Sequence, residues 1–126
     1  MDAFGKREQA FEEAFAHADE VRFKILARRN VMIAKWAADK LGYTRDTAAR
    51  YIEEISNALS VPTTDAKHND DRVIAKLVLE LTTAGWDITR EGIHKVMADF
   101  EAEARRALLS GNEARDKQHR SKTLSS

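Results

Sequence analysis

The sequence contains no cysteine, one proline and five glycines among 126 residues, and it has no long apolar run. The absence of cysteine excludes a disulfide framework and a thiolate metal site. A membrane-spanning helix needs about 18 or more apolar residues in a row, and a signal peptide needs an apolar core, so we expect a cytoplasmic protein without direct membrane insertion. The 21 basic and 21 acidic side chains cancel. Because phosphate-driven affinity needs an excess of Lys and Arg, no nucleic acid is expected as a partner.

The few glycines and the proline punctuate a helical pattern. Apolar residues recur at steps of three and four along most of the chain, which is the period of an amphipathic helix. Gly42 and Gly85 are placed to end helices, Pro62 lies in a polar loop, and Thr44 and Thr89 are N-cap candidates. The pattern predicts an all-α protein with four helices near 4–41, 44–59, 70–84 and 89–109, the last ending at Ser-Gly-Asn in 110–112.

The first predicted helix is longer than its partners, about 57 Å for 38 residues. Its second half is apolar enough to pack on a bundle, whereas its first third offers only Phe4, Phe11 and Phe15 among charged residues. An aromatic stripe of this kind has three explanations: an arm that binds another protein, part of the bundle core, or the seam of a coiled-coil dimer. We favour the arm because the other helices are too short to cover all three rings.

Charge is segregated along the chain. Residues 1–20 carry six acids and two bases, residues 21–30 carry four bases and no acid, and residues 105–126 carry six bases and two acids. The arginines at positions 22, 28 and 29 offer a basic cleft for a nucleotide. Salt bridges across the bundle are the interpretation that we favour for them.

Residues suited to catalysis or metal binding are sparse. The four histidines lie in different segments, without a recognisable nucleophile motif. Glu91 and His94 match the Glu-x-x-His pair of di-metal helical bundles, but such a site needs two pairs and two further glutamates. We therefore expect neither an enzyme nor a metal site. Histidine changes charge near neutral pH, so an effect of pH through His17 is a hypothesis.

Specific short motifs follow one another in the first 42 residues. They read Arg-Glu-x-Ala-Phe from Arg7, Phe-Ala-His from Phe15, Phe-Lys from Phe23, Ala-Arg-Arg-Asn from Ala27, and Trp-Ala-Ala-x-Lys-Leu-Gly from Trp36. In this order they resemble the zeta-subunit family, the small ATPase inhibitors of certain bacterial ATP synthases. The resemblance weakens after residue 42, although helix lengths agree to about residue 109.

The resemblance implies a four-helix bundle whose N-terminal arm is mobile when free. The arm would insert as a helix into a catalytic interface between the alpha and beta subunits of the synthase head, near the gamma subunit, and block rotation in the hydrolysis direction. The protein would then be cytoplasmic and peripheral to the inner membrane when bound. We therefore expect three segments. The resemblance implies an inhibitory arm at 1–19 and the bundle at 20–110, and the composition of 111–126 predicts a flexible basic tail.

The resemblance also implies which residues act. It assigns Arg28, Arg29, Trp36 and Leu41 to the joint and core that carry the arm. It assigns the inhibitory contact to seven residues: Phe4, Lys6, Arg7, Glu8, Phe11, Phe15 and His17. No cofactor is implied. The alternative is a helical regulatory module that binds a nucleotide or another anion and whose arm is weak or vestigial.

Overall fold

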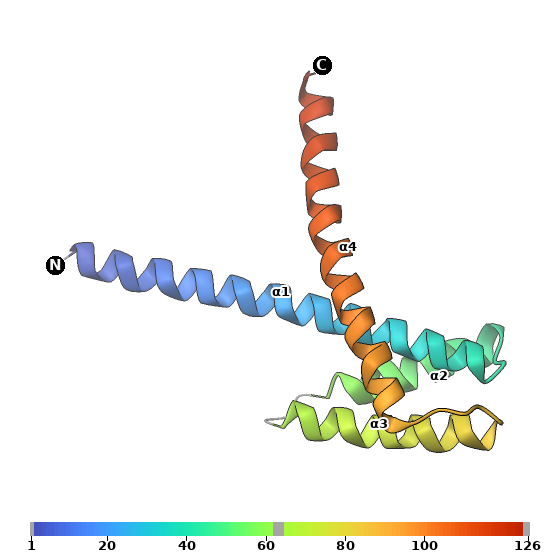
Figure 1. Ribbon diagram of the computed structural model, residues 1–126. Helices are drawn as coiled ribbons and strands as arrows, with labels where there is room; N and C mark the ends of the chain where they lie inside the picture. Colours follow the sequence, from blue (N-terminus) through green and yellow to red (C-terminus); the bar gives the residue numbers. More distant parts are fainter. Residues whose placement is uncertain (1, 62–64, 125–126) are drawn as a thin grey trace.

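The computed structural model contains the four helices that the sequence predicts, and no strand in the part of the chain that it describes (Figure 1). The helices are α1 (Asp2–Lys40), α2 (Arg45–Leu59), α3 (Ala66–Thr83) and α4 (Arg90–Leu124). The structure describes residues 2–61 and 65–124, with the helical backbone alone in 2–16 and 111–124. The prediction of an all-α protein with a long first helix is therefore confirmed.

The core lies around the second half of α1, where the other three helices pack against it. Ile33 and Ala37 of α1, Ile55 of α2, Leu77 of α3 and Ile93 of α4 have no exposed surface. These residues belong to the runs with steps of three and four, so the periodicity predicted the buried face of each helix correctly. Burial of such aliphatic side chains, about 1.5–3 kcal/mol each, is the main term that holds the helices together.

The predicted helix ends near the glycines are confirmed. Gly42 and Gly85 have φ angles of 76° and 99°, a backbone conformation in which glycine avoids the strain that a side chain would meet. The hydroxyl of Thr89 accepts a hydrogen bond from the amide of Gly92 at 3.0 Å and so caps α4. Thr44 stands at the N-cap of α2, but its side chain makes no capping hydrogen bond.

Two predicted boundaries are wrong. Helix α3 begins at Ala66 rather than near residue 70, because the Asp65 carboxylate accepts a hydrogen bond from the amide of His68 and caps a turn that precedes the apolar run. Helix α4 does not end at 110–112 but continues to Leu124. Glycine in a helix costs only about 1 kcal/mol relative to alanine, and the Glu, Ala, Arg and Lys residues that follow are good helix formers. The predicted flexible basic tail, 111–126, lies outside the residues whose side chains are described.

A second, smaller buried contact region lies where α1 and α4 cross. Ile25 and Ala104 are almost completely buried, yet neither belongs to the main core. A small residue such as Ala104 lets two helix backbones approach closely. Beyond this crossing, the first part of α1 and the last part of α4 extend away from the bundle in different directions (Figure 1). None of the helices, over the residues described, is long and apolar enough to cross a membrane.

Candidate functional site

The first half of α1 extends past the bundle. Among its described side chains, which begin at His17, the first buried one is Ile25, and all four residues from His17 to Glu20 are exposed. About 34 Å of helix precedes Ile25 at 1.5 Å per residue. Only the last part of this stretch lies beside α4, where Val21 and Arg22 line a pocket with Glu101, and Figure 1 shows the start of α1 without a helix beside it. The bundle therefore leaves the described part of this segment, 17–20, open to solvent.

All seven residues predicted to make the inhibitory contact belong to this extension. His17 is exposed. The other six, although they fall within the span of α1, lie outside the residues whose side chains are described: Phe4, Lys6, Arg7, Glu8, Phe11 and Phe15. Their role, and the predicted mobility of the arm at 1–19, stay predictions.

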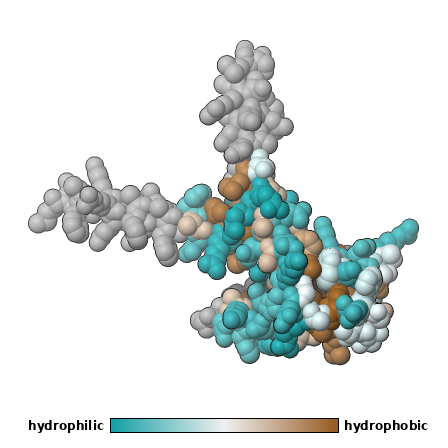
Figure 2. Space-filling model, viewed as in Figure 1, coloured by the Kyte–Doolittle hydropathy of each residue, from teal (hydrophilic) through white to brown (hydrophobic). Residues whose placement is uncertain are grey.

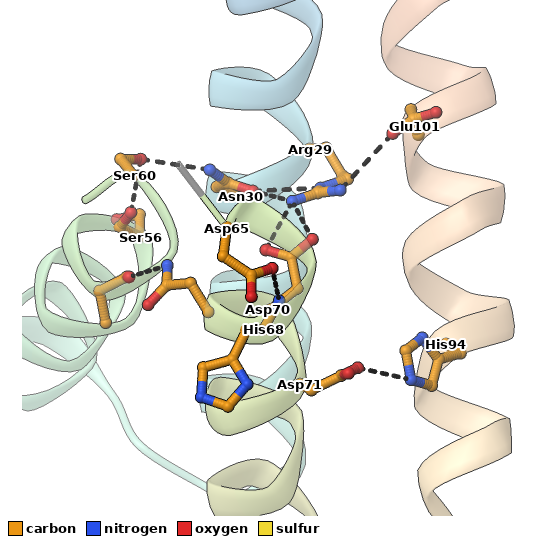
Figure 3. A network of polar contacts seen from close by, with 12 residues as sticks. Arg29, Asn30, Ser56, Ser60, Asp65, His68, Asp70, Asp71, His94 and Glu101 are labelled. Carbon is orange, nitrogen blue, oxygen red and sulfur yellow. Dashed lines mark hydrogen bonds and ion pairs between the residues drawn. The ribbon is translucent and has the colours of Figure 1, made fainter. Parts of the chain in front are cut away.

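A buried polar network ties α1 to the other three helices just beyond the crossing (Figure 3). Arg29 and Asn30 are 8% and 4% exposed, although both side chains are polar. The Arg29 guanidinium donates to Asn30 Oδ1 from Nη2 at 2.8 Å, to Asp70 Oδ2 at 3.3 Å and to Glu101 Oε1 at 3.5 Å. Asn30 Nδ2 donates to Ser60 Oγ at 3.2 Å. Two adjacent residues of α1 thereby contact α3, α4 and the end of α2.

The charges in this network compensate one another. Burial raises the pKa of Asp70, and the Arg29 guanidinium acts in the opposite direction by favouring the carboxylate. Arg29 forms ion pairs with both Asp70 and Glu101, so its positive charge compensates two carboxylates. Among the described residues, no buried side-chain nitrogen or oxygen lacks a hydrogen-bond partner. The joint is therefore a fully satisfied structural network.

The predictions for the joint are partly confirmed. Arg29 forms the expected salt bridges across the bundle, and Trp36 and Leu41 pack against the core. Arg28 is exposed and does not belong to the core, because the helical turn points it away from α3. Neither Arg28 nor Arg22 has an ion-pair partner among the described side chains, so the prediction of cross-bundle salt bridges is wrong for these two.

The opposite end of the bundle is closed by a lysine and two tryptophans. Lys40 Nζ lies 4.0 Å from the ring centroid of Trp86 and 5.2 Å from that of Trp36. The indole Nε1 of Trp86 donates a hydrogen bond to the Lys40 carbonyl at 2.9 Å, which fixes the turn after α3 against the end of α1. Trp86 remains 43% exposed, so it is an aromatic of the bundle surface.

The described side chains were expected to include no metal site. No group of three or more His, Asp or Glu side chains there could hold a metal ion. His94 of the Glu-x-x-His pair lies 3.3 Å from Asp71 and is about half exposed, which makes it a surface residue between α3 and α4 (Figure 3).

A family comparison covers both the arm and the bundle. The model of the family described as ATPase inhibitor subunit zeta matches residues 1–107. The chain belongs to this family. The comparisons with curated proteins and with solved structures give no match. The family resemblance carried by the motifs of the first 42 residues is therefore confirmed.

Membership of this family identifies the chain as an ATPase inhibitor subunit, which is a regulatory kind of protein. The matched region includes the first half of α1 and the core residues of all four helices. Sequence reasoning missed the partners of Arg29, namely Asn30, Asp70 and Glu101. The only sequence signal for these partners was that each is a polar residue at a position of its helix that otherwise faces the core.

Proposed function

We propose that this zeta-family chain inhibits ATP hydrolysis by inserting the α1 extension, residues 1–19, into the catalytic interface between the alpha and beta subunits of the synthase head. There, near the gamma subunit, the arm blocks rotation in the hydrolysis direction. The phenylalanines at positions 4, 11 and 15 anchor the arm by burial in the interface. Lys6, Arg7, Glu8 and His17 fix its register and choice of partner.

One observation supports this assignment above the others. Helix α1 begins at Asp2, and among its described side chains, which begin at His17, the first buried one is Ile25. Residues 17–20 are exposed, and the earlier part of the helix carries an aromatic stripe in its sequence, which suits the groove of another protein. The network around Arg29 supports it further, because a blocking arm must pass force into the bundle without separating from it.

The alternative is a module that binds a nucleotide with the arginines at positions 22, 28 and 29. One of these three arginines is already engaged within the bundle. Arg29 is engaged by Asp70 and Glu101 and is 8% exposed, so it is not available to a phosphate group. Titration with ATP and ADP separates the two functions. The inhibitor role survives a lack of nucleotide binding, whereas the alternative does not.

A crosslinking experiment tests where the arm binds. A photoreactive phenylalanine analogue is placed at position 11 and, as a control, at position 67, where the exposed Lys67 lies on α3. With the isolated synthase head, the probe at position 11 is expected to crosslink to alpha, beta or gamma, and the probe at 67 is not. A probe at position 11 that crosslinks only to a second copy of the chain would favour the dimer seam instead.

A further inference from the structure

A basic groove runs along the crossing of α1 and α4, beside the network around Arg29. It has a volume of about 580 Å³, and we define the basic groove by its lining, which is Lys24, Arg28, Val31, Met32, Lys35, Glu103, Ala107 and Leu108. Three cations on α1 face a single acid on α4, above an apolar floor from both helices. On the face of the molecule seen in Figure 2, apolar surface occurs in patches among hydrophilic surface.

The cations of the basic groove are free to take a partner. Lys24 lies 3.4 Å from Glu20, but both side chains are more than half exposed, and such a pair contributes little. Arg28 and Lys35 are exposed and have no ion pair with any described side chain. The groove thus presents positive charge that the described part of the bundle does not neutralise.

The spacing of the cations suits a peptide segment better than a single anion. Lys24 and Lys35 are eleven positions apart on α1, which is about 16 Å along the helix axis. A phosphate group spans only a fraction of that length. Two crossing helices with an apolar floor between them accept a third helix or an extended segment, and cations at the rim select an acidic one.

The basic groove lies on a different face of α1 from the aromatic stripe. At about 100° per residue, positions 24, 28 and 35 fall on one face, and positions 4, 11 and 15 fall roughly 140° away around the helix. A helix inserted between two subunits meets a wall on each side. If the aromatic stripe contacts one of these two subunits, the residues further along α1 on its opposite side contact the other subunit.

We propose that the basic groove docks an acidic, amphipathic segment of the synthase head, at the wall of the catalytic interface opposite the one that receives the phenylalanines. This inference depends on the proposed function of the arm. The groove begins five residues after the arm ends, so insertion of the arm brings Lys24 and Arg28 to the surface of the head. The docked segment then holds the bundle while the arm blocks rotation.

The test measures half-maximal inhibition of ATP hydrolysis by the full chain at low and moderate salt. The double variant Arg28→Glu with Lys35→Glu is expected to need about tenfold more protein at low salt and to lose most of the salt dependence. Glu103→Gln is expected to inhibit at a lower concentration than the unaltered chain, because it removes the only acid of the groove. Since Glu103 is exposed, this second variant stays informative if the first fails to fold.

A matched control separates the groove from overall charge. Lys67→Glu with Arg72→Glu makes the same charge change at exposed positions of α3 outside the groove, and it is expected to inhibit like the unaltered chain. Equal weakening by both double variants would overturn the proposal. So would self-association or ATP binding that the Arg28 and Lys35 substitutions abolish, because the groove would then have another occupant.

The outcome for the groove is distinguishable from that for the arm. If the unaltered chain inhibits, the chain without 1–19 does not, and the Arg28 and Lys35 variant inhibits normally, the groove proposal alone is wrong. If the unaltered chain does not inhibit at all, the proposed function itself is wrong.

Discussion

The Nη2 atom of Arg29 on α1 lies 3.3 Å from Oδ2 of Asp70 on α3, although the two residues are 41 positions apart in the sequence. This ion pair, together with the contact from Arg29 to Glu101 of α4, joins three helices near the point where α1 leaves the bundle. A helix that transmits a blocking force needs such an attachment. The first predictions therefore concern the stability of this joint.

Replacement of Arg29 by leucine is expected to lower the free energy of unfolding by about 2–4 kcal/mol, because it leaves two half-buried carboxylates without their cation. Chemical denaturation followed by tryptophan fluorescence measures the change. Arg28→Leu is the matched control, because Arg28 is next to Arg29 but is exposed and has no ion pair among the described residues. This substitution is expected to change the free energy of unfolding by less than about 0.5 kcal/mol. Equal effects of the two substitutions would contradict a structural role for the network.

The crossing of α1 and α4 is expected to be sensitive to side-chain size. Ala104 has no exposed surface, so Ala104→Leu should cost about 1–3 kcal/mol by overpacking. Ala98 is exposed on the same helix, and Ala98→Leu should be nearly neutral. Thermal melts of both variants check the difference. A fully tolerated leucine at position 104 would show that the helices do not approach closely there.

Tyr51 is expected to make the stability of the fold depend on pH in the alkaline range. Burial, followed by the hydrogen bond that its hydroxyl donates to Glu80 at 2.9 Å, raises the pKa of Tyr51 well above its ordinary value of 10.0. When the folded pKa is the higher one, the stabilisation is complete below the unfolded pKa and is lost as pH rises through the folded value. The free energy of unfolding should therefore fall above pH 10.

The matched variant is Tyr51→Phe. At pH 8 it should be less stable than the unaltered chain by about 1 kcal/mol, the contribution of one hydrogen bond. Above pH 10 the difference should shrink, because phenylalanine cannot ionise in the unfolded state. Urea denaturation at pH 8, 10 and 11 measures both effects. A constant difference across this range would show that Tyr51 ionises equally in the folded and unfolded chain.

The aromatic stripe should matter for inhibition and not for stability. Phe11→Ala with Phe15→Ala is expected to abolish inhibition of ATP hydrolysis and to leave helix content and the melting temperature nearly unchanged. Circular dichroism and a hydrolysis assay measure the two properties on the same sample. A large loss of stability would instead assign the rings to the core of the bundle.

Much of the fold follows from the sequence, because burial and helix ends have local signals. The spacing of Tyr51, Ile55 and Leu59 predicted the buried face of α2, and Gly42 and Gly85 marked the ends of helices. The start of α3 was misplaced because its cap, Asp65, stands before a polar turn rather than before an apolar residue. Local pattern is a weak guide where a cap decides the boundary.

The site was only partly predictable, because it depends on how helices lie relative to one another. That Arg29 would form a salt bridge was predictable from its place in a helix that packs on others. Its partners, Asp70 and Glu101, were not, since they come from helices whose relative position no local pattern gives. For the same reason, Arg28 could not be separated from Arg29 as a member of a surface groove.

The most direct test of the account compares two proteins in one assay. ATP hydrolysis by the isolated synthase head is measured with the full chain and with a chain that lacks residues 1–19. Inhibition by the full chain and none by the shortened one is the predicted result, and it would establish the α1 extension as the functional element. Inhibition by the shortened chain would contradict the account, because the bundle would then be sufficient without the arm.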